Sequence, residues 1–271
     1  MTFDLDRYRV APGTTVRLAD RSTDDTQGMK KGDARALTAE TVARIDGLQE
    51  RLYAEGTRSL LVVLQAMDGA GKDSTIRAVF GPLNPQGIRV APFKAPTEIE
   101  KGHDFLWRVH QQAPAKGELV VFNRSHYEDV LVVKVHGWAP PDVIERRYEH
   151  IRAFERLLAD GATRVVKVML HVSKAYQLTR MRKRMEDPTK HWKFNPGDLE
   201  ERKLWDDYMA AFEAALSETS TEAAPWHVVP AENRWFRDLV VSRLVADALA
   251  EMDPQFPPPT YDPATVTLEG A

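Results

Sequence analysis

Five short apolar runs recur along the chain, and a stretch with helical periodicity separates each run from the next. The run SLLVVLQA at residues 59–66 is almost entirely apolar, which is typical of a strand buried on both faces of a parallel sheet. Strands that alternate with helices predict a doubly wound α/β fold, in which ligands bind at the carboxyl ends of the strands. The predicted strands cover residues 59–66, 88–92, 118–123, 164–170 and 226–230, and the predicted helices include 73–80, 98–112, 141–159, 173–185, 198–217 and 233–252.

The length of 271 residues fits one α/β domain with appended segments. Residues 1–37 are polar and turn-rich, and we expect an N-terminal extended arm there. Thr38 then begins the first helix of a domain that spans residues 38–252, with a lid at about residues 180–200. The proline-rich residues 253–271 are expected to form an extended tail on the surface or on a neighbouring subunit.

Composition limits the classes of function. The absence of cysteine excludes a disulfide framework and a thiolate metal site. The N-terminus has no apolar core of a secretion signal, and no apolar run is long enough to cross a membrane, so we expect a cytoplasmic protein without a membrane partner. The net charge of −3 argues against a general nucleic-acid coat protein, and no nucleic-acid partner is expected.

The segment LLVVLQAMDGAGKDSTI at residues 60–76 indicates a strand, a tight loop and the start of a helix. Such a loop exposes backbone N–H groups that bind phosphate, and Lys72 after Gly71 supplies a mobile positive charge. The loop departs twice from the pattern G-x-x-x-x-G-K-[ST], because Ala66 replaces the first glycine and Asp73 replaces the hydroxyl residue. The segment therefore predicts a phosphate loop with unusual carboxylates.

Two aspartates in this loop have different alternative explanations. Asp73 either favours the positive end of its helix or contributes to phosphate chemistry. Asp68 lies in a loop that attracts anions, where its own charge would repel the ligand. A carboxylate at that position is explained by a Mg²⁺ ion between the acid and the phosphate, or by a role as proton acceptor.

The segment VVFNRSHYED provides a second group of polar residues at the end of the third predicted strand. Phosphate-loop enzymes often carry a Mg²⁺-binding aspartate here, and this chain has Asn123, followed by Arg124. The planar guanidinium of an arginine can donate two hydrogen bonds at once to a phosphate group. Glu128 completes the pattern S-x-x-E with Ser125, so it is either part of a helix capping box or a nucleotide or metal ligand.

The third group is a basic helix. Eleven Lys/Arg and only five Asp/Glu lie between Arg164 and Lys203, which favours a polyanionic ligand over a merely solvated helix face. Arg180 and Arg184 share one face of the predicted helix with Gln177, just before a turn-rich segment that has the character of a lid. The histidines do not form a metal-binding pattern, so no zinc site is expected.

The motifs QAMDGAGKDSTI, FKAPTE, FNRSHYED and RMRKRMEDPTKHWKFNPGD together resemble the polyphosphate kinase 2 family, over roughly residues 30–250. Asn123 within NRSHYED resembles the subgroup called class III, because other classes carry Asp at that position and an apolar residue near Glu128. The resemblance implies a three-layer αβα P-loop kinase fold similar to thymidylate kinase, with a parallel sheet of about five strands and a helical lid. It also implies a homodimer or homotetramer.

The resemblance further implies Mg²⁺-dependent transfer of the terminal phosphoryl group of inorganic polyphosphate to ADP and AMP, reversibly, with Mn²⁺ as a possible substitute ion. Carried over to this sequence, the implied catalytic residues are Asp68, Lys72, Asn123, Arg124, Arg180 and Arg184. The implied polyphosphate-binding residues are Ala70, Gly71, Lys72, Asp73, Lys94, Arg124, Arg180 and Arg184. The nucleotide is assigned to Glu128, Lys193 and Asp198, and the metal to Asp68, Asn123 and Glu128.

Two alternative functions stand beside this one. An ATP-dependent nucleoside monophosphate kinase would share the fold, but the loop lacks the Ser/Thr that holds Mg²⁺ against a bound triphosphate. A non-catalytic polyanion- or nucleotide-binding protein would not need Asp68, Lys72 and Arg124 together. Polyphosphate in the loop, with the nucleotide opposite and metal between them, accounts for Asp68 as well.

Overall fold

The computed structural model describes residues 3–266 and, within them, everything but the side chain of Lys193. Its centre is a sheet of five parallel strands in the order β2-β3-β1-β4-β5. All five predicted strands are confirmed, with ends that differ from the prediction by at most one residue. The strands are β1 (Ser59–Ala66), β2 (Ile88–Pro92), β3 (Leu119–Asn123), β4 (Thr163–His171) and β5 (Trp226–Pro230).

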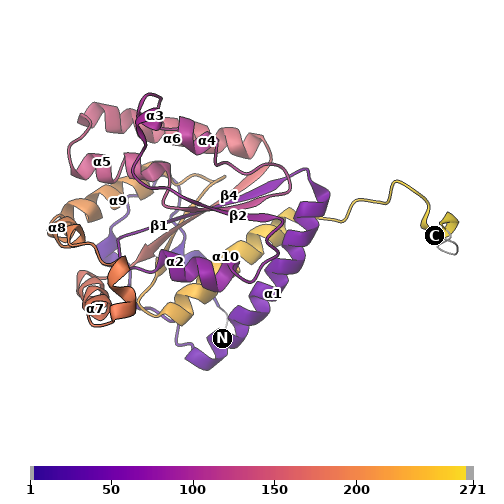
Figure 1. The fold of residues 1–271 in the computed structure, drawn as a ribbon, viewed down its shortest axis with the longest axis horizontal. Helices are drawn as coiled ribbons and strands as arrows, with labels where there is room; N and C mark the ends of the chain where they lie inside the picture. Colours follow the sequence, from indigo (N-terminus) through magenta and orange to yellow (C-terminus); the bar gives the residue numbers. More distant parts are fainter. Residues whose placement is uncertain (1–2, 267–271) are drawn as a thin grey trace.

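Helices cover both faces of the sheet, so the fold is the predicted three-layer αβα arrangement (Figure 1). One layer contains α1 and α10, which pack along each other, together with α2; the other contains α4, α5, α6 and α9 (Figure 1). The helices of these layers are α1 (Lys31–Glu55), α2 (Lys72–Thr75), α4 (Trp107–His110), α5 (Val132–Val135), α6 (Pro141–Asp160), α9 (Trp205–Thr219) and α10 (Arg234–Met252).

The middle strands are the core of the protein. In β1, Leu60 to Leu64 are fully buried, and they pair in register with Leu119 to Asn123 of β3 and with residues 164–168 of β4. Burial on both faces explains why these strands are continuous apolar runs rather than alternating ones. Because all the strands are parallel, their carboxyl ends meet at one edge of the sheet, where the loops can build a site.

The start of the first helix differs from the prediction. Helix α1 begins at Lys31, so residues 31–37 are helical and do not belong to an extended arm. Thr38 lies inside the helix and does not cap it. Its hydroxyl donates to the carbonyl of Ala34, one turn earlier, at 2.7 Å. A threonine can make this bond to the preceding turn as readily as it caps, so the sequence signal was ambiguous. Residues 3–30 contain only the short 3₁₀ turns η1 (Asp6–Tyr8) and η2 (Leu18–Asp20).

Two predicted helices are interrupted. The segment 98–112 forms α3 (Glu98–Lys101) and α4, separated by Gly102 and by a turn in which the Asp104 carboxylate accepts from Leu106 N at 2.9 Å. The segment 198–217 forms α8 (Gly197–Lys203) and α9, which are separated at Leu204. The helix after the phosphate loop continues from α2 as a π-helical turn, η3 (Ile76–Phe80).

The predicted lid segment lies beside the carboxyl edge of the sheet (Figure 1). It consists of α7 (Lys174–Met185), the 3₁₀ turn η5 (Pro188–Lys193) and α8. None of the helices among residues 3–266 combines the length and apolar character that crossing a bilayer requires.

The C-terminal segment leaves the body rather than lying along it (Figure 1). Gln255 N still donates to the Glu55 carboxylate at 3.2 Å, but the following residues are exposed as far as the 3₁₀ turn η6 (Pro263–Thr265). Residues 267–271 of the predicted tail lie outside the described residues. Contact with a neighbouring subunit stays a prediction.

Candidate active site

The phosphate loop connects the carboxyl end of β1 to the first residue of α2. Gly69 and Gly71 adopt positive φ angles of 88° and 107°, which side chains rarely allow. A Cβ atom at Gly71 would also collide with the guanidinium of Arg237. Glycine at position 71 is therefore required both by the backbone and by a close neighbour.

Lys72 is almost completely buried under this loop. Its Nζ donates to the carbonyl of Ala66 at 2.9 Å and lies 4.0 Å from the Asp68 carboxylate. Burial lowers the pKa of Lys72, and the negative charge of Asp68 opposes that effect. The lysine is thus held inside the loop, next to the space that a phosphate would occupy.

Arg124 joins the loop carboxylate to the end of β3. Its Nη2 donates to Asp68 at 2.7 Å, and its Nη1 lies 3.5 Å from the Glu128 carboxylate. Its φ of 63° is unusual for a non-glycine residue, and its backbone N donates to Leu64 O at 3.1 Å. Burial would raise the pKa of Asp68, but the charges of Lys72 and Arg124 outweigh it and lower that pKa, so Asp68 is ionised at neutral pH.

Asn123 and Asp73 meet across the loop. The side-chain amide of Asn123 donates to the Asp73 carboxylate at 2.9 Å, which fixes an aspartate of α2 to the last residue of β3. Asp73 therefore does more than interact with the positive end of its helix, because it also bonds to a side chain of β3. It leaves the amide oxygen of Asn123 as the atom that a metal or its waters could use.

Helix α7 brings its predicted face to the loop. Gln177 donates to the backbone carbonyl of Asp68 at 2.9 Å, and Arg180 and Arg184 follow on the same face. Arg184 lies 3.8 Å from the Asp198 carboxylate of α8. Burial raises the pKa of Asp198, and the nearby charge of Asp68 raises it further. The helix that leads into the predicted lid therefore contacts the phosphate loop, and Arg180 and Arg184 of the lid line the same cavity as the loop.

These elements enclose a cavity of about 460 Å³. All the residues predicted to be catalytic or to bind polyphosphate line it, including Lys94. Glu128 and Asp198 do not line the cavity, but each contacts an arginine that does: Glu128 contacts Arg124, and Asp198 contacts Arg184. The nucleotide assignment of Lys193 concerns a side chain outside the described part of the structure. The Lys and Arg residues of the lining are Lys72, Arg77, Lys94, Arg124, Arg180, Arg184, Lys190, Arg234 and Arg237.

Sequence reasoning missed the contribution of α10. The fully buried Arg237 donates to Ala70 O at 3.2 Å and to Ser74 Oγ at 3.0 Å, so it supports the loop from behind. Burial lowers the pKa of Arg180, and repulsion from Arg234 and other arginines adds to that effect. The available signal was position, because Arg234 and Arg237 closely follow the last strand at the carboxyl edge of the sheet.

The capping-box explanation of Glu128 is wrong. Ser125 Oγ accepts from Tyr127 N at 3.2 Å, not from the backbone of Glu128, and the segment forms a 3₁₀ turn, η4 (His126–Asp129). The Glu128 carboxylate instead approaches Arg124. A true capping box occurs in α3, between Thr97 and Glu100.

Asp68, Asn123 and Glu128 offer oxygen atoms of the kind that Mg²⁺ binds. Among residues 3–266, no three His, Cys, Asp or Glu side chains converge as a metal-binding group. Mg²⁺ does not need such a group, because it commonly takes one or two carboxylates and completes its shell with waters and substrate phosphates. Asp68 is 40% exposed, so one of its oxygens is accessible to an ion.

The sheet order, the phosphate loop and the cationic cavity together define a P-loop phosphotransferase of the kinase type. Residues 28–257 match the family model described as Polyphosphate kinase 2 (PPK2). The chain belongs to this family, as its motifs predicted.

Two relatives match almost the whole chain. It is 51% identical over 267 residues to the AMP/ADP-polyphosphate phosphotransferase of Meiothermus ruber, covering 98% of this chain and 100% of the relative. It is 40% identical to the ADP-polyphosphate phosphotransferase of Rhodopseudomonas palustris, covering 96% of this chain and 94% of the relative. The crystal structure of polyphosphate kinase 2 from Arthrobacter aurescens TC1 superposes with a TM-score of 0.92 at 48% identity, covering 95% and 92% of the two chains.

Proposed function

We propose that the chain transfers the terminal phosphoryl group of inorganic polyphosphate to ADP and to AMP, in a reversible reaction that makes ATP. The observation that carries the proposal is a cavity lined by nine Lys and Arg residues around a phosphate loop that lacks the usual Ser/Thr. Relatives named as polyphosphate phosphotransferases support it over an ATP-dependent nucleoside monophosphate kinase.

The reaction breaks the bond between the terminal phosphorus and its bridging oxygen and forms a bond to a phosphate oxygen of the nucleotide. Lys72 and Arg124 bind the donor chain, because both lie at the loop and carry charges suited to phosphate. Arg180 and Arg184 approach from α7 and stabilise the charge on the moving phosphoryl group. Asp68 is ionised among these cations, where it accepts a proton from the acceptor phosphate or binds metal.

Asp68, Asn123 and Glu128 would hold Mg²⁺, or Mn²⁺ in its place. A bound ion would neutralise charge shared by the donor and acceptor phosphates. Glu128 contacts Arg124 and Asp198 contacts Arg184, two arginines that line the cavity, which supports assigning these carboxylates to the nucleotide. The assignment of Lys193 to the nucleotide stays a prediction. Assembly as a homodimer or homotetramer and a cytoplasmic location stay predictions.

A donor–acceptor matrix with purified protein and Mg²⁺ tests the proposal. Polyphosphate is offered with ADP and, separately, with AMP, and the products are separated by anion-exchange chromatography. We expect ATP from both acceptors, with ADP as the intermediate when AMP is supplied. ATP from ADP alone would contradict the AMP activity. Phosphorylation of a nucleoside monophosphate by ATP, without any use of polyphosphate, would contradict the proposal as a whole.

Glu128 provides a test of acceptor choice. Glu128→Val should lose the use of AMP while keeping the use of ADP, because we assign this carboxylate, which lies beside Arg124, to placing a metal ion or organising the AMP phosphate at the acceptor end. The measurement is kcat/KM for each acceptor with polyphosphate as donor, and Glu128→Gln separates loss of charge from loss of size. Equal losses with AMP and ADP would mean that Glu128 only positions Arg124.

A further inference from the structure

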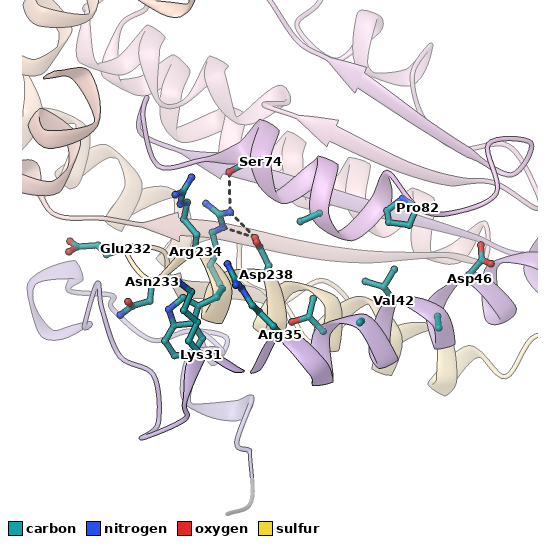
Figure 2. Close-up of a pocket in the computed structure, with 16 residues that line it drawn as sticks. Lys31, Arg35, Val42, Asp46, Ser74, Pro82, Glu232, Asn233, Arg234 and Asp238 are labelled. Carbon is teal, nitrogen blue, oxygen red and sulfur yellow. Dashed lines mark hydrogen bonds and ion pairs between the residues drawn. The ribbon is translucent and has the colours of Figure 1, made fainter. Parts of the chain in front are cut away.

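A second cavity, which we call the basic groove, lies between the first half of α1, the α2–η3 helix and the start of α10 (Figure 2). Its volume is about 890 Å³. It shares Ser74, Arg234 and Arg237 with the lining of the active-site cavity, so the two cavities adjoin behind the phosphate loop. The function proposed above assigns no role to this groove.

The charges of the basic groove are unevenly distributed. Lys31, Arg35 and Arg234 gather at one end, and Asp46 lies at the other (Figure 2). All three basic residues are exposed, and Lys31 and Arg35 are one helical turn apart on α1. Among the described residues, no hydrogen bond or ion pair engages the charged ends of these three side chains.

The acidic side chains near this end already have partners. The Asp238 carboxylate accepts from Arg237 at 2.7 Å. The Glu232 carboxylate, which also lines the groove, accepts from the backbone N of Ser173 at 2.9 Å. The end near Arg234 therefore keeps an uncompensated positive charge, which suits an anion.

The donor of the proposed reaction is a polyanion that can be much longer than the active-site cavity. A cavity of about 460 Å³ can enclose only its first few phosphates, so the rest of the chain must leave the site. Arg234 lines both cavities, and Lys31 and Arg35 continue the positive charge beyond it. A flexible chain of phosphates follows such a series of exposed cations because each contact releases bound counterions.

We infer that Lys31 and Arg35, reached past Arg234, form a distal subsite for the phosphates of long polyphosphate chains that extend out of the active site. This inference rests on the proposed function. It is restricted to the basic end, because the opposite half of the groove is lined by Val42, Ala78 and Pro82, which offer nothing to a phosphate. The subsite would set the preference of the enzyme for chain length.

The double variant Lys31→Glu/Arg35→Glu tests the subsite. With ADP as acceptor, we expect KM for long-chain polyphosphate to rise about five- to tenfold, while KM for a short oligophosphate and kcat with either donor stay unchanged. The slope of log KM against log salt concentration for the long chain should also decrease in magnitude by roughly 0.7 to 1 for each lost contact. Both residues are exposed, so the fold should tolerate the change.

Arg51→Glu is the matched control, because Arg51 is also exposed on α1 but lies more than four helical turns beyond Arg35, outside the groove. Its KM for long chains should match that of the wild type. An unchanged long-chain KM in the double variant, or equal rises for long and short donors, would overturn the distal subsite. Failure of the wild type to use any polyphosphate would instead overturn the proposed function.

Discussion

Replacement of Asp68 by asparagine is expected to lower kcat with polyphosphate and ADP by roughly 10²- to 10⁴-fold while the fold is retained. The change keeps the size of the side chain and removes one negative charge. That charge is present at neutral pH, because Lys72 and Arg124 lower the pKa of Asp68. The variant would therefore lose the carboxylate that accepts a proton or holds Mg²⁺, and Arg124 would lose its partner at 2.7 Å.

The measurements are kcat from initial rates and Tm from thermal unfolding of the same preparation. Asp142→Asn is the matched control, because Asp142 also pairs with an arginine, Arg146, at 2.8 Å, but on the exposed surface of α6. The control should keep wild-type turnover. Turnover of Asp68→Asn close to that of the wild type would remove Asp68 from the mechanism, and a large loss of Tm would assign it to stability instead.

The sheet was predictable from the sequence because burial on both faces leaves a direct signal. The strands of a covered parallel sheet are near-continuous apolar runs, and turn-rich segments separate them from the helices. The run at residues 59–66 satisfies both conditions, and β1 has the same limits. The strand order was not predicted, because an apolar run does not indicate which strands pair with it.

Helix ends were harder to predict, because one residue type can satisfy the backbone in several ways. Thr38 bonds to the preceding turn instead of capping, and Ser125 accepts from Tyr127 N instead of completing a box with Glu128. Gly102 divides a periodic segment, since the turn around it satisfies the backbone as well as a continuous helix would. These choices depend on tertiary contacts that a local pattern does not contain.

The site residues that follow β1 and β3 were placed correctly, and the arginines at the start of α10 were missed. Asp68 and Arg124 follow β1 and β3, so parallel topology alone brings them to one edge. Arg237 is far from the phosphate loop in sequence and supports it only because α10 packs beside α2. Nothing in the local sequence around Arg237 distinguishes it from an ordinary arginine in the first turns of a helix.

Replacement of Lys167 by methionine is expected to reduce the free energy of unfolding by about 3–5 kcal/mol. The Lys167 Nζ is fully buried in β4 and donates to Glu155 at 2.6 Å, to Thr219 O at 2.7 Å and to Tyr127 OH at 3.0 Å. Burial would raise the pKa of Glu155, but the Lys167 ammonium outweighs it and lowers that pKa. Without the ammonium, Glu155 is left with the His126 ring at 3.5 Å and the Tyr127 hydroxyl at 2.8 Å, or must take up a proton.

Thermal unfolding measures the effect, which corresponds to a fall in Tm of roughly 6 to 20 °C for a chain of this size. Lys101→Met is the matched control, because Lys101 pairs with Glu98 at the same distance of 2.6 Å, but with side chains 55% and 89% exposed, and its Tm should hardly change. The double variant Lys167→Met/Glu155→Leu should recover most of the stability, since it leaves no unpaired buried charge. A single variant as stable as the wild type would show that the pair contributes nothing. A double variant no more stable than the single one would show instead that the bonds from Lys167 to Tyr127 and Thr219, which hold β4 against η4 and α9, are what the fold requires.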